Sequence, residues 1–366
     1  MIRELVITVL IVLFPTSVVY SQTSGENAKE SRSEPKEVLV ETQHEVEIAG
    51  EVIKYKATAG KLLMKSDDLK SRAEVFFVAY TKNEAESSAR PITFCFNGGP
   101  GSSSVWLHLG MLGPKRIRFP EDASFLKPPY RLDANNYSLL DQTDLVFIDP
   151  VSTGYSRPVN DVNKSEFHGY EEDVQSVGQF IHDYTTRFLR WPSPKFLCGE
   201  SYGGIRAAGL AAHLQDRYNM ELNGIIVVSG AINFQTLRFS NANDVPFICF
   251  LPTYTATAWY HQALPADQQQ RPLAELVKES EAFARGDYAQ ALLKGSSISE
   301  DEFQATAETM SRLTGLSAEY IRSANLKVSM GRFGKELLRS RGLTIGRFDG
   351  RYSSHDRDNA GETYEF

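Results

Sequence analysis

Cysteine, net positive charge and long hydrophobic runs are all scarce in this sequence of 366 residues. Its three cysteines are too few for a small disulfide-stabilised fold and could form one bridge at most. A formal net charge of −7 argues against a general nucleic-acid-binding surface. Hydrophobic residues make up 42% of the chain and charged residues 23%, which excludes a disordered or collagen-like protein and allows a large buried core.

The common signatures of metal and phosphate sites are also missing from the sequence. No cluster of His, Cys, Asp and Glu has the spacing of metal ligands. Neither G-K-[ST] nor G-x-G-x-x-G occurs, so the glycine-rich segment described below does not match a phosphate loop. We therefore expect no metal ion and no cofactor.

The one hydrophobic run of any length lies at the start of the chain. It covers the ten residues 5–14, follows Arg3 and ends at Pro15. A charged tip, a run of about 7–15 apolar residues and a polar exit are typical of a secretory signal peptide, and a membrane span needs about 18–20 residues. We predict a signal peptide over residues 1–21, a flexible leader over 22–36, and export to the periplasm or the cell exterior. The alternative is an uncleaved membrane anchor.

Two kinds of hydrophobic pattern predict strands. Between Val38 and Tyr80 apolar and polar residues mostly alternate, which indicates an antiparallel meander. Further on, the short runs 92–96, 145–148, 196–198 and 225–228 are apolar at all or nearly all positions, as in parallel strands buried between helix layers. Cys95 and Cys198 lie inside two of these runs, so we expect both to be core residues.

Helical periodicity appears in two places. Between the second and third apolar runs, apolar residues recur at spacings of three and four, which predicts an amphipathic crossover helix; they are Val174, Val177, Ile181, Tyr184 and Phe188. Residues 264–338 show helical patterns and no strand signal. The sequence therefore predicts an α/β fold with a mixed, mostly parallel sheet. We assign an α/β core to 37–235, a helical cap insertion to 236–345 and a return to the core to 346–366.

A candidate nucleophile follows the third apolar run. Residues 199–203 read GESYG and fit G-x-S-x-G, between the predicted strand 196–198 and a predicted helix over 205–218. A strand–turn–helix setting is what a nucleophile elbow requires. Such a turn holds its serine, here Ser201, in a strained conformation where the helix N-terminus favours developing negative charge. The alternative is an ordinary glycine-rich turn between a strand and a helix.

A glycine-rich loop follows the first apolar run. Residues 97–104 read NGGPGSSS and come directly after the predicted strand 92–96. Glycines leave backbone N–H groups accessible, and an acyl-transfer oxyanion hole takes one of its donors from the loop after an early strand. We expect this loop to supply that donor.

Three segments in this order resemble the serine carboxypeptidase family of α/β-hydrolases. They are residues 97–103 (NGGPGSS), 149–156 (DPVSTGYS) and 199–204 (GESYGG), and the resemblance covers roughly Val75 to Asn233. It implies an α/β-hydrolase fold and the release of single residues from the free C-termini of peptides through an acyl-enzyme. It also implies that Ser201 is the nucleophile and that the backbone N–H groups of Gly99 and Tyr202 form the oxyanion hole.

The resemblance further implies a site for the terminal carboxylate of the substrate. Asn97, the Gly98 amide and Glu200 would hold that group. Two carboxylates in contact repel unless they share a proton, so Glu200 fits only when protonated, which implies an acidic working range. The family often has a second glutamate where Met111 stands, and its absence weakens the expected selectivity for a free C-terminus.

No convincing triad Asp or His follows Ser201, although this fold places both after the serine. His213 lies about three turns along the predicted helix, too far to touch Ser201. His261 falls at the start of the predicted cap, and His355 is a candidate base or a solvated residue of a polar tail. Asp349 belongs to a segment that precedes the last sheet strands in the family. We predict that this chain lacks those strands and the two triad residues. The alternatives are an esterase or acyltransferase of the same fold and a catalytically inactive binding homologue.

Overall fold

A computed structural model describes residues 36–86, 89–159 and 162–361. The predicted signal peptide and all of the predicted leader except Lys36 lie outside the described residues. Among the described residues, no helix is long and apolar enough to cross a membrane.

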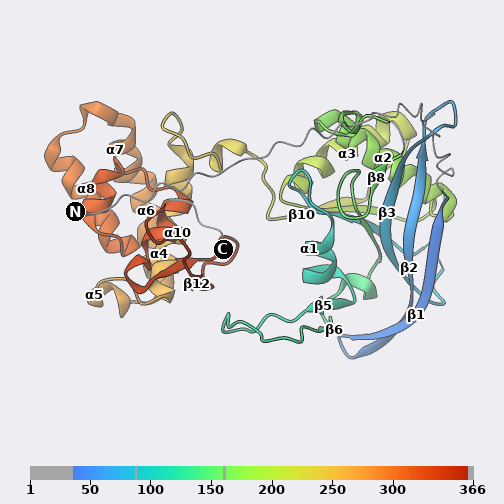
Figure 1. Cartoon of the computed structure of the whole chain (residues 1–366), viewed down its shortest axis with the longest axis horizontal. Coiled ribbons are helices and arrows are strands. Elements are labelled where there is room, and N and C mark those ends of the chain that lie inside the picture. Colours follow the sequence, from blue (N-terminus) through green and yellow to red (C-terminus); the bar gives the residue numbers. More distant parts are fainter. Residues whose placement is uncertain (1–35, 87–88, 160–161, 362–366) are drawn as a thin grey trace, which may run out of the picture. The chain divides into compact units, whose positions relative to one another are not determined.

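A mixed sheet organises the first part of the chain (Figure 1). Its strand order is β1-β2-β3-β7-β4-β9-β10, with β8 paired to β3. Strands β1 to β3 form an antiparallel meander, β3 pairs antiparallel with β7, and β7, β4, β9 and β10 run parallel. The predicted meander and parallel strands are therefore confirmed. The bounds are β1 (Val38–Ile48), β2 (Glu51–Lys65), β3 (Ser71–Lys82), β4 (Ile92–Phe96), β7 (Asp144–Ile148), β8 (Arg157–Pro158), β9 (Lys195–Glu200) and β10 (Gly224–Val228).

Each face of the central strands has its own core, because successive side chains of a strand point to opposite faces. On one face, α2 (Tyr170–Arg187) and α3 (Tyr202–Tyr218) bury a cluster that includes Phe94 and Leu197. On the other, the cluster includes Cys95 and Cys198, fully buried on adjacent strands, and Leu107 of the short α1 (Val105–Leu107). The crossover helix and the core positions of both cysteines are confirmed, and all three cysteines are free thiols.

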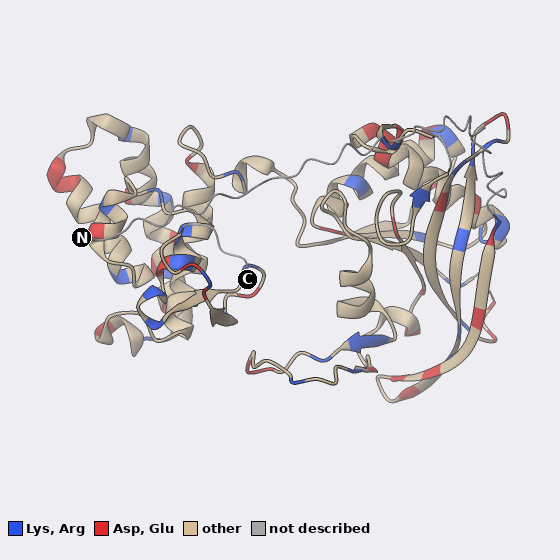
Figure 2. Ribbon diagram, viewed as in Figure 1, with Lys and Arg blue, Asp and Glu red and all other residues tan. Residues whose placement is uncertain are grey.

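Charges of opposite sign lie on the neighbouring strands β1 and β2. Figure 2 shows acidic residues along β1 and basic residues on β2. Glu45 pairs in register with Lys54, and Glu41 forms an ion pair with Lys56 at 2.8 Å. Opposite charges on neighbouring strands favour this pairing, each such contact adding a few tenths of a kcal/mol up to about 1.

The later part of the chain is helical and has a second hydrophobic core of its own. The helices are α4 (Val245–Tyr260), α5 (Ala266–Gln269), α6 (Leu273–Phe283), α7 (Ala289–Lys294), α8 (Glu300–Thr314), α9 (Ala318–Ser323) and α10 (Met330–Glu336). Helix α8 begins with a capping box formed by Ser299 and Glu302 and ends at Gly315. The helical prediction for residues 264–338 is confirmed, while the proposed limits of the cap insertion stay a prediction.

Short elements complete the described structure. Small antiparallel ladders join β5 (Lys115–Ile117) to β6 (Leu132–Ala134) and β11 (Leu343–Ile345) to β12 (Ser353–His355). The single turns are η1 (His108–Leu112), η2 (Leu139–Asp141), η3 (Lys164–Phe167), η4 (Phe234–Thr236), η5 (Ala284–Tyr288), η6 (Gly295–Ser297) and η7 (Arg339–Arg341). Within the described residues, nothing after β10 pairs with the main sheet.

Strand β10 forms one edge of the main sheet and exposes apolar side chains. Ile225, Ile226 and Val227 are 40%, 38% and 45% exposed. Of the described strands, only β9 pairs with β10, so its other edge presents unpaired backbone groups. An apolar edge strand of this kind is a template for pairing with another strand.

Candidate active site

Ser201 occupies a strained turn between β9 and α3. Its backbone angles are φ 58° and ψ −122°, a conformation that serine adopts only when its surroundings impose it. Those surroundings include β10 and the residues after it: the Ser201 N–H donates to the Val228 carbonyl at 2.9 Å, and the Ala231 N–H donates to the Ser201 carbonyl at 3.1 Å. The strand–turn–helix arrangement expected of a nucleophile elbow is therefore present.

The glycine-rich loop after β4 lies directly against this turn. A Cβ atom on Gly98 would come within 2.5 Å of the Tyr202 nitrogen, so only glycine permits the approach. Within the described residues, neither the Gly99 amide nor the Tyr202 amide donates a hydrogen bond. The two amides predicted for the oxyanion hole thus lie on neighbouring segments and remain available as donors. Their role in binding an oxyanion stays a prediction.

The three groups expected to hold a carboxylate are in mutual contact. Asn97 Nδ2 donates to Glu200 Oε2 at 3.0 Å, and the Gly98 N–H points to the same oxygen at 3.4 Å. Asn97 is fully buried, and its Oδ1 accepts the Leu107 N–H at 3.0 Å, which fixes the side-chain amide with its NH₂ group toward Glu200. The structure brings this carboxylate-binding group, defined as Asn97, Gly98 and Glu200, together. Its binding function stays a prediction.

The segment 149–156 is hydrogen-bonded to the glycine-rich loop of residues 97–104, which is called the oxyanion loop below after its predicted role. Asp149 Oδ1 accepts the Ser104 N–H at 2.9 Å, and Oδ2 accepts the Tyr155 N–H at 3.2 Å. Burial raises the pKa of Asp149. A side chain at Gly154 would overlap Asp149 Oδ2, and Ser156 Oγ donates to the Asp149 carbonyl at 2.6 Å. The sequence marked this segment only by resemblance. In the structure, Asp149 hydrogen-bonds both to its own segment at Tyr155 and to the loop 97–104 at Ser104.

A cavity of about 570 Å³ lies beside the elbow and was not foreseen from the sequence. Five separate stretches of chain line it, so no local pattern could have revealed it. Burial raises the pKa of the Tyr202 phenol to about 12, and His168 Nε2 lies 3.1 Å from Ser152 Oγ. The main lining residues are Pro100, Gly101, Ser152, Thr153, His168, Tyr170, Tyr202 and Phe234.

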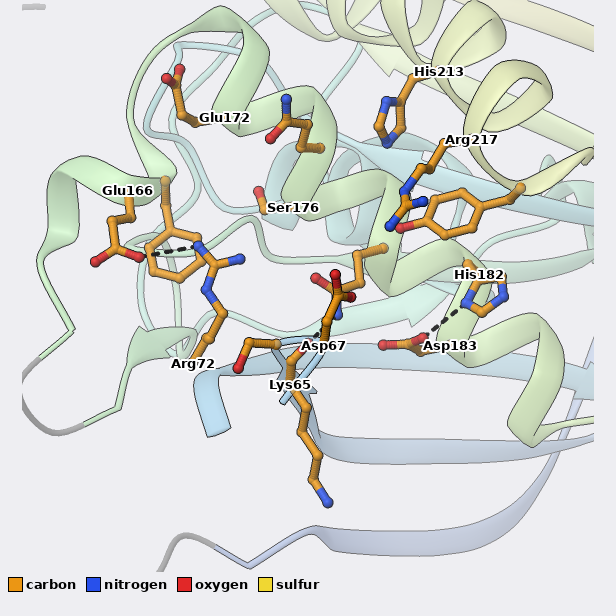
Figure 3. A pocket seen from close by; sticks show the side chains of 15 residues that line it. Lys65, Asp67, Arg72, Glu166, Glu172, Ser176, His182, Asp183, His213 and Arg217 are labelled. Atoms are coloured by element: carbon orange, nitrogen blue, oxygen red, sulfur yellow. Dashed lines mark hydrogen bonds and ion pairs between the residues drawn. The ribbon is translucent and has the colours of Figure 1, made fainter. Parts of the chain in front are cut away.

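His213 lies in another cavity, of about 610 Å³, between α2, α3 and the turn after β2 (Figure 3). Its ring packs edge-on against Tyr218 with centroids 5.8 Å apart, and burial lowers its pKa. It stands 12 residues beyond Ser201, about 18 Å along the helix axis. Two contacts in this cavity join its lining residues: the ion pair of Arg72 with Glu166 at 3.2 Å, and a hydrogen-bond contact of 2.9 Å between His182 Nδ1 and Asp183 Oδ1. The expectation that His213 does not reach Ser201 agrees with this placement.

The other two candidate bases also have different surroundings. His261 Nε2 lies 2.7 Å from the Gly350 carbonyl, and His355 is an exposed residue of β12. Ser201 Oγ makes no hydrogen bond to any described residue. Within the described part of the chain, the structure therefore brings no base to the predicted nucleophile.

Comparisons with known proteins show which family the chain resembles in sequence. A family model described as "Serine carboxypeptidase" matches residues 52–332. The pheromone-processing carboxypeptidase KEX1 of Saccharomyces cerevisiae is 32% identical over 158 residues, which are 40% of this chain and 20% of that protein. Its counterpart from Aspergillus fumigatus is 29% identical over 177 residues, 45% of this chain and 26% of the relative. These matches span only about a fifth to a quarter of the length of those relatives.

Solved structures give weaker likenesses. A crystal structure of the S. cerevisiae KEX1 carboxypeptidase matches 71% of this chain and 53% of that chain, at 22% identity and a TM-score of 0.45. A bacterial heroin esterase matches 50% of this chain and 47% of that chain, at 14% identity and a TM-score of 0.30.

Proposed function

Because the chain belongs to the serine carboxypeptidase family and has its α/β-hydrolase fold, we propose that it is a serine-type carboxypeptidase acting through Ser201. The substrates would be peptides with a free C-terminus. One observation carries this proposal: two unpaired amides and a carboxylate-binding group meet at a single strained serine. Such a site can bind the end of a peptide and stabilise the charge that develops when its last bond is attacked.

In the proposed reaction, Ser201 Oγ attacks the carbonyl carbon of the last peptide bond. The carbonyl oxygen becomes an oxyanion between the Gly99 and Tyr202 N–H groups. The C–N bond then breaks, the original C-terminal residue leaves as its amine accepts a proton, and the rest of the peptide stays on Ser201 Oγ as an ester that water hydrolyses. Asn97, Gly98 and Glu200 would hold the terminal carboxylate, with a proton shared between that group and Glu200. The proton of Ser201 must pass to a base, which no described residue beside Ser201 supplies.

A second candidate function follows from the observation that no described residue brings a base to Ser201. A chain with this site but no base would bind peptide C-termini without cleaving them, since loss of a triad member typically lowers the rate by about 10⁴ to 10⁶. An esterase or acyltransferase is a further form of the same chemistry. The exposed Met111, in place of a second glutamate, is the residue that favours this form.

The test is covalent labelling of the full chain with a fluorophosphonate, followed by peptide mass mapping and by assays on a blocked dipeptide and its ester. We expect a label on Ser201, release of the C-terminal residue, and loss of both in Ser201→Ala. The exposed Ser323→Ala serves as the control and should leave both unchanged. Activity that survives in Ser201→Ala would refute the proposal. An unlabelled protein that still binds the dipeptide would favour the binding function.

We also propose that the protein is exported after cleavage near Ser21 and Gln22. N-terminal sequencing of the protein from its natural source tests this directly. A mature N-terminus near residue 22 is the expected result, and an N-terminus at Met1 in a cytoplasmic fraction would contradict it.

A further inference from the structure

Arg206 is a fully buried cation to which the motifs assign no role. It lies in α3, and its side chain is 1% exposed. Its Nε and Nη2 donate to the two carboxylate oxygens of Asp173 at 2.7 and 3.0 Å, and its Nη1 donates to the backbone carbonyl of Asn97 at 2.6 Å. The guanidinium carbon also lies 5.2 Å from the centre of the Tyr202 ring. One side chain therefore joins α2, the elbow and the oxyanion loop.

The bond to the Asn97 carbonyl fixes the orientation of a whole peptide group. In a trans peptide, the carbonyl of one residue and the N–H of the next point in opposite directions. Because Arg206 holds the carbonyl of Asn97, the N–H of Gly98 points to the other side, where Glu200 Oε2 lies at 3.4 Å. Arg206 thus determines, from the buried side, that the Gly98 N–H and not the Asn97 carbonyl faces Glu200.

Without Arg206 this peptide group could invert. Inversion rotates ψ of Asn97 and φ of Gly98, and glycine adopts either sign of φ at little cost. An inverted group would aim the Asn97 carbonyl, instead of the Gly98 N–H, at Glu200 and at any bound carboxylate. Oxygen atoms would then face one another where a donor now faces an acceptor, and an anion would be repelled.

We propose that Arg206 is a positioning residue that locks the Asn97–Gly98 peptide with its N–H toward the site, and that Asp173 holds Arg206 in place. The lock deepens the proposed function and rests on it, because that function identifies the bound anion as the terminal carboxylate of a peptide. The buried charge of Arg206 is compensated by its bidentate pair with Asp173, a geometry that suits a guanidinium and not an ammonium group.

The variant Arg206→Lys tests the lock, because lysine keeps the charge but lacks the planar fork of donors that binds both Asp173 oxygens and the Asn97 carbonyl. We expect a crystal structure of the ligand-free variant to show the Asn97–Gly98 peptide inverted. We also expect KM to rise about 10- to 100-fold for a blocked dipeptide with a free C-terminus, the usual range for a hydrogen bond to a charged group. The same dipeptide as a C-terminal amide should show no such rise.

Arg190→Lys is the matched control. Arg190 is also buried, pairs with Asp144 at 2.6 Å and donates to the backbone carbonyl of Arg90 at 3.0 Å, before the start of β4. It shares the chemistry of Arg206 but lies at the opposite end of that strand, so its variant should leave the ratio of acid to amide KM unchanged. Where Arg206→Lys does not fold, Asp173→Asn loosens the same anchor and is measured in the same two ways.

The two proposals fail in different ways. An Asn97–Gly98 peptide that keeps its orientation in the variant overturns the lock, whatever the activity. Wild-type protein that turns over neither dipeptide refutes the peptidase proposal, while the crystal structure of the variant still decides on the lock.

Discussion

The sharpest stability prediction concerns His108, in η1 next to the oxyanion loop. Its Nε2 lies 2.6 Å from the Tyr80 hydroxyl, and its ring stacks on Phe147 with centroids 4.5 Å apart. Burial lowers the pKa of His108 from 6.5 to about 4. The folded protein therefore holds this imidazole neutral, hydrogen-bonded to the Tyr80 hydroxyl, at pH values where the unfolded chain protonates it.

The magnitude follows from this lowered pKa. Between pH 6.5 and about 4 the unfolded chain binds one proton more than the folded protein at this site, so stability falls as the pH falls. The difference between 6.5 and about 4, at 1.36 kcal/mol per pH unit, corresponds to about 3 kcal/mol of unfolding free energy. That amount is fully present above pH 6.5 and lost as the pH drops to about 4, with a slope approaching 1.4 kcal/mol per pH unit between these values.

Urea denaturation of wild type and His108→Gln at pH 4.5, 5.5, 6.5 and 7.5 measures this slope. Glutamine keeps a hydrogen-bonding partner for the Tyr80 hydroxyl and takes up no proton, so the variant should lose about 1 kcal/mol per pH unit less than wild type between pH 5.5 and 4.5. His355→Gln, at an exposed position, is the control and should follow wild type. Parallel pH profiles for wild type and His108→Gln would refute the reasoning.

Three further predictions follow from the site and the sheet edge. Gly98→Ala places a Cβ atom about 2.5 Å from the Tyr202 nitrogen, so fluorophosphonate labelling of Ser201 should slow by 10-fold or more; equal labelling rates would show that the loop need not touch the elbow. Asp149→Asn leaves one of two amide donors without an acceptor and should lower the unfolding free energy by about 1–3 kcal/mol in urea titrations. Ile226→Lys puts a charge on the exposed edge strand and should reduce self-association in light scattering at an unchanged melting temperature.

Much of the sheet could be predicted because burial on both faces leaves a plain trace in the sequence. The run 92–96 is apolar at nearly every position and is β4 in the structure, with every residue buried. Helix α2 was equally clear, since its apolar residues recur on one side. Helix α4 gave no such signal. It is apolar around most of its circumference and contains Pro252, so neither hydrophobic periodicity nor helix propensity predicts it. Its side chains contribute to the second hydrophobic core, and this packing explains why the segment is helical.

The site divides in the same way. Ser201 and Glu200 belong to one short motif and Gly98 to another, so the sequence could single out all three, and the structure brings the two motifs into contact. The contact of Arg206 with the Asn97 carbonyl joins residues 109 positions apart and involves a backbone atom on one side. Every residue has a backbone carbonyl, so no sequence motif can predict which one Arg206 contacts. It becomes visible only when the fold brings α3 behind the oxyanion loop.

The arrangement of these contacts predicts that the proposed binding of a carboxylate and the proposed reaction at Ser201 can be altered separately. The carboxylate-binding group is tied together by hydrogen bonds through Asn97 and Glu200, and Arg206 holds it from the buried side. Ser201 Oγ takes part in none of these bonds. A change at Arg206 should therefore alter the affinity for a free carboxylate and leave the reactivity of the serine toward a fluorophosphonate nearly unchanged, whereas Ser201→Ala should abolish labelling and leave affinity intact. If both properties fell together in Arg206→Lys, the two halves of the site would be one mechanical unit, and the lock would act on the elbow as well as on the loop.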